Sequence, residues 1–325
     1  MGDALRPLVG QLREGDELIV IDNDSSDGTP DVVREAAPYA TLIEAGENLG
    51  FAGASNRGAA LSSRALLLFL NPDAVVAPGF RDAIELPLTE RRGWAAWQGL
   101  VTSQDGLLVN SRGGVVHFTG IAWAGGAGER VGEGKGAPSE PGFASGACLA
   151  IPAASFERAG GFAEPFFLYH EDVDLSLRLR LAGGRLGTET RARADHDYDF
   201  AKGPEKWRHL ERNRWATVIR TYPAALLALI GPALLATELA LVPISLAGGW
   251  APQKLASWLD VARWFPRLLR ERRRIQSSRQ VSAGAFARAL TPDLDSTYLG
   301  AAARSRLSRA ALRVYWSAVL ALLPG

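Results

Sequence analysis

Two kinds of hydrophobic pattern alternate over the first part of the chain. Short apolar runs, Leu18–Ile21 and Ala65–Leu70, are typical of strands buried on both faces of a sheet. Between and after them lie segments with helical spacing, at Pro30–Ala37, Phe51–Ser63 and Phe80–Leu86. This β-α-β-α order predicts a parallel α/β sheet.

Polar turn clusters end both of these predicted strands. Asp22–Thr29 follows the first, and Thr29 is the expected N-cap of a helix with Pro30 at its first position. Asn71-Pro72-Asp73 follows the second. Because ligands of open α/β sheets bind beyond the carboxyl ends of strands, both clusters are candidate binding sites. An ordinary solvated turn is the structural alternative for each.

Three carboxylates crowd the segment His170-Glu171-Asp172-Val173-Asp174, just before a helix predicted at Leu175–Ala182. Such density is costly unless cations, helix-terminal N–H groups or solvent compensate it. One of the three is suited to act as a general base toward a hydroxyl. Helix capping is the structural alternative for one of them, and Asp174 is the candidate for that role.

Two further features concern single residues. His196 lies in Asp195-His196-Asp197, where an imidazole is either a metal ligand or a structural side chain. Cys148 is the only cysteine, so it forms no internal disulfide, and we expect it to be a buried packing residue.

Residues 99–142 are glycine-rich and weakly periodic, which predicts a loop or a small β insertion.

The character of the chain changes after about residue 202. Tyr222–Ala247 is an apolar stretch in which Glu238 is the only charged side chain; it contains three prolines and has arginine-rich flanks on both sides. Basic flanks at both ends favour a re-entrant or interfacial helical hairpin over a single span, with prolines dividing it. A soluble hairpin packed on the rest of the chain or on a homodimer partner is the alternative. Ser308–Leu323 is expected to be a further amphipathic helix.

Composition narrows the function classes. The chain has 325 residues, 36 Lys+Arg against 35 Asp+Glu, a net charge of +1 and 47% hydrophobic residues. These values exclude a disordered, collagen-like or disulfide-scaffold protein. Near-zero charge gives no support for nucleic-acid binding. Met1–Leu12 has no apolar run of a secretory signal, so a cytoplasmic location is expected.

The order of the motifs resembles family 2 glycosyltransferases. Val20–Thr29 looks like their nucleotide-contacting segment, and Asn48–Gly58 resembles their next signature. Leu70-Asn71-Pro72-Asp73 is similar to the aspartate motif of rhamnosyltransferase-like members, and Gly160–Arg178 resembles their acceptor-side Glu-Asp motif. His196 falls where related enzymes carry a metal-binding histidine.

The resemblance implies a GT-A fold and an inverting transfer of a hexose from a nucleoside-diphosphate sugar. Asp172 would be the general base, and Glu171 would support it or bind the acceptor. Asp73 with His196 would hold Mg²⁺ or Mn²⁺ on the donor diphosphate. Asp22 would contact the nucleoside. The positions implied in donor binding are Asp22, Asn23, Asp24, Asn48, Gly50, Phe51, Asn56 and Asn71.

The sequence departs from the family pattern at three places. Asn71 stands where many members have a first aspartate, so the metal is expected to be held more weakly or mainly by the diphosphate. Ala163 replaces an acid common after Gly-Gly-Phe. Members also begin with a strand ahead of the helix that leads into Leu18, and we expect the natural chain to begin earlier than Met1.

We therefore expect a GT-A catalytic domain over 1–202 and a helical, membrane-associated region over 203–325, on the cytoplasmic face of the membrane. By analogy, the donor is dTDP-rhamnose and the acceptor is a polyprenyl-linked or other cell-envelope glycan. Two alternatives remain open. One is a catalytically impaired membrane scaffold of the same fold, and the other is a nucleotidyltransferase, against which the Glu-Asp motif argues.

Overall fold

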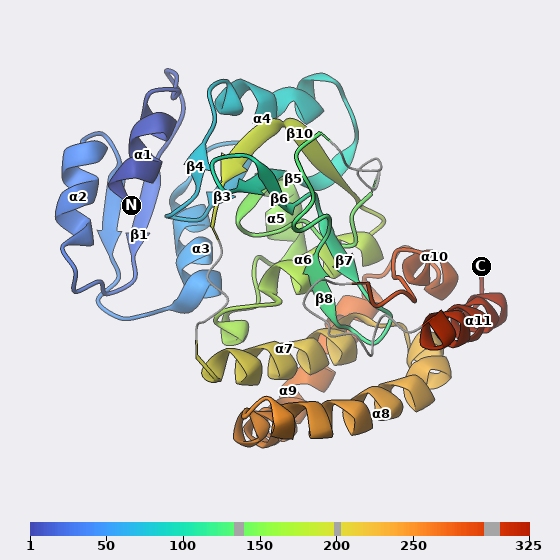
Figure 1. Ribbon diagram of the computed structural model, residues 1–325. Helices are drawn as coiled ribbons and strands as arrows, with labels where there is room; N and C mark the ends of the chain where they lie inside the picture. Colours follow the sequence, from blue (N-terminus) through green and yellow to red (C-terminus); the bar gives the residue numbers. More distant parts are fainter. Residues whose placement is uncertain (133–139, 198–202, 296–305) are drawn as a thin grey trace. The chain divides into compact units, whose positions relative to one another are not determined.

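The computed structural model describes residues 1–132, 140–197, 203–295 and 306–325, and they form two compact units (Figure 1). The first unit comprises Met1–Gly114, Ala124–Leu179 and Gly184–Tyr198. The second comprises Val115–Trp123, Arg180–Gly183 and Asp199–Gly325. The expected domain boundary at residue 202 lies outside the described residues.

A parallel strand pair follows the first helix, α1 (Gly2–Val9). β1 (Ile19–Asp22) pairs with β2 (Thr41–Glu44), and α2 (Thr29–Ala36) connects them. The prediction that Thr29 caps α2 is wrong. The N-cap is Gly28 at φ +78°, a left-handed conformation that glycine adopts without a steric penalty.

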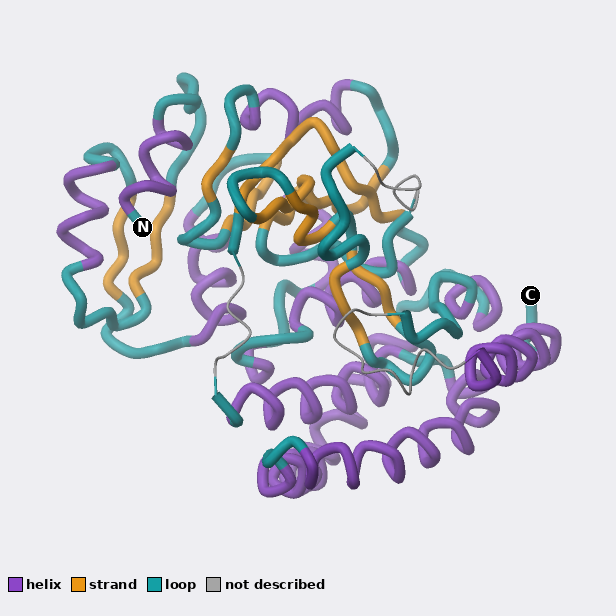
Figure 2. Tube along the Cα trace, in the orientation of Figure 1, coloured by secondary structure: helices purple, strands orange, loops and turns teal. Residues whose placement is uncertain are grey.

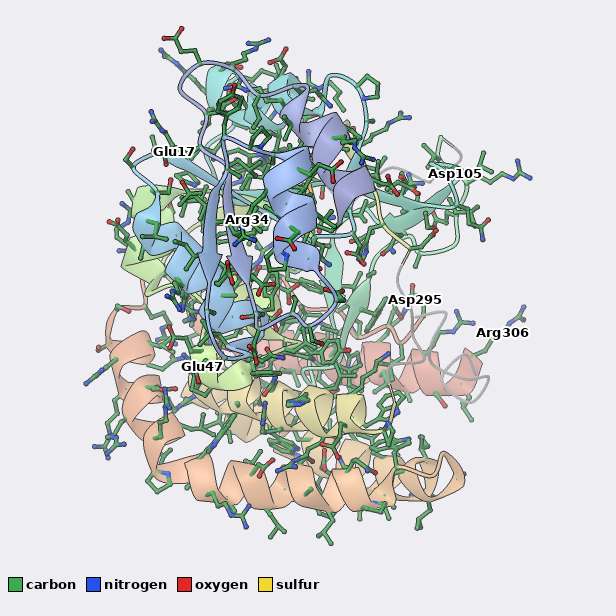
Figure 3. All side chains as sticks on the ribbon, turned by 90° about the vertical axis from the view of Figure 1, so that its left-hand side faces the viewer. Glu17, Arg34, Glu47, Asp105, Asp295 and Arg306 are labelled. Atoms are coloured by element: carbon green, nitrogen blue, oxygen red, sulfur yellow. The ribbon has the colours of Figure 1, made fainter. Side chains whose placement is uncertain are left out.

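Side-chain contacts hold this strand pair to its helices. Glu17, just before β1, accepts hydrogen bonds from Ser62 and Ser63, which follow α3 (Gly50–Leu61) (Figure 3). Arg34 of α2, which Figure 3 labels, pairs with Glu44 at the end of β2. These contacts fix the start of β1 and the end of β2.

A six-stranded sheet forms the centre of the first unit. Its order is β3-β9-β5-β10-β4, with β6 paired to β5. Only β5 and β10 are parallel, so the sheet is mixed and the expectation of a parallel sheet is corrected. The bounds are β3 (Leu66–Leu70), β4 (Val75–Val76), β5 (Trp94–Ser103), β6 (Leu108–Ser111), β9 (Cys148–Pro152) and β10 (Arg185–Asp195).

The hydrophobic core of the first unit packs against this sheet. Trp97 of β5 is fully buried, and its indole N–H donates to the Ile84 carbonyl of α4 (Phe80–Thr89) at 2.9 Å. Cys148 of β9 is buried, as the sequence predicts, and it is a free thiol. The remaining helices of this unit are α5 (Ala153–Ala159), the short 3₁₀ helix η1 (Glu164–Phe166) and α6 (Glu171–Leu181).

The described part of the glycine-rich region 99–142 contains short strands, as the predicted alternative of a small β insertion requires, whereas the strand β5 at its start was not predicted. The long strand β5 enters it, and β6, β7 (Gly114–Val116) and β8 (Ala122–Ala124) follow. β5 is buried on both faces over most of its length. The sequence of β5 therefore lacks the alternation that marks a half-exposed strand, which explains why β5 was not predicted.

The second unit is largely helical (Figure 2). Helix α7 (Glu205–Thr221) packs against α9 (Ala251–Ser277), and α8 (Ala224–Ala247) runs between them in sequence. The expectation that prolines divide this stretch is wrong. α8 continues through Pro232 and Pro243, since a proline inside a helix removes one hydrogen bond and can kink the helix without ending it.

Buried charges join these three helices. Glu211 and Arg214 of α7 lie 3.0 Å apart, and Lys254 of α9 lies 2.7 Å from Glu238 of α8. Arg214 also pairs with Glu238, and Lys254 with Glu211. A buried charge left without its partner costs several kcal/mol, so the network fixes how α8 is rotated about its axis.

The described part of the second unit contains two more helices. They are α10 (Ala283–Ala287), capped by the Ser282 side chain, and α11 (Arg306–Leu322). α11 confirms the predicted helix near the carboxyl end. It buries Trp316, which stacks on Phe118 with ring centroids 4.8 Å apart.

Candidate functional site

Asp22 ends β1 with a buried carboxylate. One oxygen, Oδ2, accepts the Ser25 amide at 3.2 Å. The other, Oδ1, is buried and has no hydrogen-bond partner among the described residues. A buried acceptor left unsatisfied costs about 1–3 kcal/mol. The Asp22 oxygen is therefore suited to accept a hydrogen bond from a ligand donor such as a base N–H or a ribose hydroxyl.

Asn23 connects this strand end to the next motif. Its side chain accepts the Leu49 amide at 3.2 Å and donates to the Gly50 carbonyl at 3.2 Å. Asn48 accepts the Gly50 amide at 3.0 Å. The oxygen and the nitrogen of the Asn23 side-chain amide are thus both bonded to backbone groups. In the structure this side chain positions the 48–50 turn. Asp24 follows at φ +66°, an uncommon conformation that aspartate tolerates in turns.

Gly50 begins α3 in a position that excludes any side chain. Its φ is +68°, and an added Cβ would lie 2.5 Å from the Phe167 ring and backbone. The Phe167 carbonyl in turn accepts the Ala52 amide at 3.2 Å. The start of α3 is therefore packed directly against the segment that leads to Glu171.

Phe51 and Asn56 also act through contacts with later segments. The Phe51 ring packs edge-on against Phe162, with centroids 5.5 Å apart. The Asn56 side chain exchanges hydrogen bonds with the Phe162 backbone and donates to Glu164 at 3.0 Å. These side chains hold the Gly-Gly-Phe loop against α3, a positioning role that the sequence did not distinguish from ligand contact.

Asn71, Asp73 and His196 come together, although 123 or more residues separate the histidine from the other two in sequence. His196 Nε2 lies 3.1 Å from Asp73 Oδ1 and 3.2 Å from Asn71 Nδ2. The imidazole is buried, whereas the Asp73 side chain is 61% exposed. The His196 backbone is fixed by Thr102 and by Asn110, which donates to its carbonyl at 2.7 Å.

The donor set of this cluster suits a divalent cation that keeps other ligands. Within the described ranges, no group of three or more His, Cys, Asp and Glu side chains gathers as a metal site. Asp73 and His196 supply one carboxylate and one imidazole. Mg²⁺ is commonly bound by one or two carboxylates together with substrate phosphates and waters. Two protein ligands therefore fit a metal shared with a diphosphate.

Glu171 and Asp172 lie in the first turn of α6, not before the helix as the sequence suggested. Asp172 accepts the Gly146 amide at 2.9 Å and the Val173 amide at 2.8 Å. Burial raises the pKa of Asp172, and burial together with the neighbouring Asp172 charge raises that of Glu171. Glu171 Oε2 is buried without a hydrogen-bond partner among the described residues.

The loop Ala144–Ala147 joins the two halves of this site, and its role was not predicted from the sequence. Gly146 donates to Asp172, and the next carbonyl, Ala147, accepts the Asn71 amide at 3.1 Å. Ser145 donates its amide to Gln98 at 2.8 Å. The signal was present as the small residues Ser145-Gly146-Ala147 just before β9.

Asp174 has a different role from the predicted cap. It forms a buried ion pair with Arg178, one helical turn later, at 2.7 Å. Arg178 also donates to the Gly161 carbonyl at 2.7 Å. The capping prediction is therefore wrong, because the side chain points along the helix to a cation that also holds the Gly-Gly loop.

Comparisons with known proteins identify the family and the fold of the chain. The sequence profile described as glycosyl transferase family 2 matches residues 2–86. N-acetylglucosaminyl-diphospho-decaprenol L-rhamnosyltransferase of Mycobacterium tuberculosis, found for two strains, is 30% identical over 230 residues. The match covers 62% of this chain and 73% of the mycobacterial protein.

The chain belongs to glycosyl transferase family 2.

As a member of this family the protein is a glycosyltransferase, and its first unit has the GT-A fold. Among solved structures, GalNAc-T7 with UDP, GalNAc and Mn²⁺ is similar with a TM-score of 0.50 and 15% identity. The similarity covers 66% of this chain and 44% of that one. The predicted family, fold class and enzyme class are thus confirmed.

An acidic residue lies next to one of the positions where the chain departs from the family pattern. Ala163 stands where an acid is common, and it precedes the 3₁₀ helix that begins at Glu164. The Glu164 carboxylate accepts a hydrogen bond from Asn56 at 3.0 Å. An acidic group is therefore present beside the Gly-Gly-Phe loop, displaced by one residue.

Proposed function

We propose that this glycosyltransferase moves a deoxyhexose, with rhamnose as the leading candidate, from a nucleoside diphosphate to a hydroxyl of a lipid-linked glycan. The observation that carries the proposal is the linkage of Asp172 to the Asn71 turn through Gly146 and Ala147. One short loop holds a candidate base and a candidate diphosphate-binding turn. The name of the mycobacterial relative supports rhamnose and a diphospho-polyprenol acceptor.

The proposed reaction is a direct displacement at the anomeric carbon. The Asp172 carboxylate takes the proton of the acceptor hydroxyl as its oxygen forms the new glycosidic bond, while the bond to the diphosphate breaks and the configuration inverts. The electron pair of the breaking bond leaves with the nucleoside diphosphate. A general base works best with a pKa closer to the operating pH than that of a free aspartate. Burial moves the pKa of Asp172 in that direction.

The donor side of the site uses Asp22 for the nucleoside and the Asp73–His196 pair for the diphosphate. When bound, Mg²⁺ or Mn²⁺ neutralises charge on the departing diphosphate. His196 is held by its backbone and buried, so it offers its Nε2 in a fixed position beside Asp73. The solved GalNAc-T7 complex contains UDP and Mn²⁺, which supports a metal-assisted donor site of this kind.

A membrane surface is the proposed location of the second unit. Among the described residues, one helix, α8, is long and apolar enough to cross a membrane. Its outward side chains include Leu235, Leu239 and Leu246, which are 62%, 66% and 67% exposed. Exposed apolar area beside the arginines of α9 fits the interface of an anionic bilayer, where the unit would lie without crossing.

The test is sugar transfer by the variant Asp172→Asn, with Asp105→Asn as the matched control (Figure 3). Asp105 is an exposed residue of the β5–β6 turn. We expect Asp172→Asn to fold, to bind donor and to lose at least about 100-fold in kcat, since general-base catalysis contributes 10²–10⁴-fold. Equal rates for both variants would exclude Asp172 as the base, and a wild-type rate no higher than background would favour the scaffold alternative.

A further inference from the structure

The second unit contains a cationic cavity that the proposed transfer reaction does not use. Its volume is about 470 Å³, within the range of small-molecule sites. Its lining consists of Ala224, Leu269, Arg272, Arg273, Gln276 and Arg279. Three of these six side chains carry a positive charge and none carries a negative one, so the cavity favours an anion.

Two of the lining residues also fix the walls of the cavity. The Arg272 guanidinium donates to the Ile219 and Tyr222 carbonyls, each at 2.6 Å. The Gln276 amide donates to the Thr221 carbonyl at 2.8 Å. These carbonyls lie at the end of α7, where a helix leaves acceptors without intrahelical partners. The α9 segment is thus bound firmly to α7, and the cavity is preformed.

The other two arginines have no such structural partner. Among the described residues, no carboxylate forms an ion pair with Arg273 or Arg279, and both are exposed. Glu271, the acid nearest in sequence, pairs instead with Arg220 at 3.0 Å and Arg267 at 2.7 Å. Burial and the charge of Arg279 lower the pKa of Arg272, which shows that like charges face one another here. A bound anion would relieve that repulsion.

The cavity also continues an apolar surface. Leu269 lines it, and Leu255, Leu259 and Phe265 on the same helix are 55%, 50% and 46% exposed. Intervals of four, six and four residues place these side chains on a broad common face of α9. A ligand with an anionic head and an apolar chain therefore matches the cavity together with the face beside it.

We infer that Arg272, Arg273, Gln276 and Arg279 form a binding site for the phosphoryl head group of an amphiphile. The two sources of this chemistry are the diphosphate of a lipid-linked acceptor and the head group of an anionic phospholipid. Guanidinium groups bind phosphoryl oxygens through paired, charge-assisted hydrogen bonds. The choice of the acceptor as source rests on the proposed function, whereas the phosphoryl site itself does not.

The test compares Arg273→Gln/Arg279→Gln with the control pair Arg270→Gln/Arg274→Gln in the full chain. The control removes the same charge from exposed positions of α9 that do not line the cavity. Binding is measured without divalent metal for farnesyl diphosphate and for vesicles of phosphatidylglycerol with phosphatidylcholine. We expect the cavity variant to weaken binding of one probe by about tenfold or more, and the control by less than about threefold.

The outcomes below either assign the phosphoryl site to one source or overturn it. Selective loss of farnesyl diphosphate binding assigns the site to an acceptor diphosphate, and selective loss of vesicle binding assigns it to phospholipid. Equal weakening by both variants, or no weakening by the cavity variant, overturns the site. Thermal stabilisation by nucleotide sugars is followed in parallel, because a failure of the proposed function would remove that signal and leave the binding results interpretable.

Discussion

Gly146 donates its backbone amide to the Asp172 carboxylate at 2.9 Å. An added Cβ at this glycine would lie 3.0 Å from the Phe51 ring and 3.7 Å from the Asp172 Cβ. The close approach of the loop to the base therefore depends on the absence of a side chain. The next residue of the loop, Ala147, accepts the Asn71 amide, so a displacement of the loop would move both the Asp172 carboxylate and the Asn71 turn.

Gly146→Ala tests this dependence. The new methyl group would displace the Phe51 ring or the loop, and we expect kcat to fall about tenfold while the protein stays folded. A misplacement of 1 Å in a catalytic group can cost about 100-fold. The control is Gly58→Ala on α3, where an added Cβ meets only an ordinary contact at 3.5 Å. It should keep kcat and, as a glycine replaced within a helix, gain up to about 1 kcal/mol of stability. Equal kcat for both variants would contradict the coupling.

The pH dependence of catalysis follows from the raised pKa of Asp172. Only the ionised carboxylate accepts a proton, so kcat/KM should fall as the pH drops through the raised pKa. The acid limb should therefore lie above 3.8, the ordinary aspartate value. A series of kcat/KM measurements at saturating metal locates it. The residual activity of Asp172→Asn should lack this limb, and a limb common to both proteins would assign it to another group.

The buried Glu171 should make folding stability depend on pH. Its pKa in the folded protein is raised well above 4.5, mainly by burial. As the pH rises above 4.5, the unfolded chain releases this proton before the folded protein does. The folded state then binds more protons, and the free energy of unfolding falls with rising pH until the folded pKa is passed. Glu171→Gln should flatten this decline between acidic and neutral pH.

Chemical denaturation at a series of pH values measures the effect. The control is Glu157→Gln, which removes a carboxylate from an exposed position of α5. It should follow the wild-type pH profile. If both variants change the slope of stability against pH equally, the burial of Glu171 does not account for it.

The motifs could be predicted from sequence because they lie at strand ends and helix starts that the local pattern marks. The apolar runs predict β1 and β3, and the polar residues after them contact other candidate motifs, Asn23 the 48–50 turn and Asp73 the His196 imidazole. The partners of those residues were not visible, since Gly146 is one small residue in a weak pattern and reaches Asp172 only through the fold. The antiparallel placement of β9 between β3 and β5 was also hidden, because it is a non-local pairing.

Roles within a motif were equally hard to separate. Asn23 and Asn56 carry ligand-like side chains, and the structure shows both bonded to backbone groups. The position of Asp174 in the sequence suits a helix cap, but its carboxylate forms an ion pair with Arg178 one turn later. Residue type and spacing indicate which segments form the site, whereas three-dimensional contacts decide which side chains remain available to a ligand.

His196 should control the affinity of the donor site for metal. His196→Ala removes the imidazole that lies 3.1 Å from Asp73, and we expect the dissociation constant for Mn²⁺ in the presence of nucleotide to rise about tenfold or more. Isothermal titration and the Mn²⁺ concentration at half-maximal rate both report it. The control His209→Ala changes a histidine of α7 that contacts Arg212 and should leave both values unchanged. Equal changes would place the metal elsewhere.

The exposed face of α8 should bind the membrane through its leucines. Leu239→Glu/Leu246→Glu places two charges on side chains that are 66% and 67% exposed, so the fold should tolerate them. Full burial of a leucine side chain is worth about 1.5–3 kcal/mol, and a charge forfeits that gain and adds repulsion from anionic lipids. We therefore expect flotation with phosphatidylglycerol vesicles to fall at least about tenfold. The control Leu107→Glu alters a leucine that is also 67% exposed but lies in the turn before β6, and it should float like the wild type. Undiminished flotation of the α8 variant would show that another surface makes the contact.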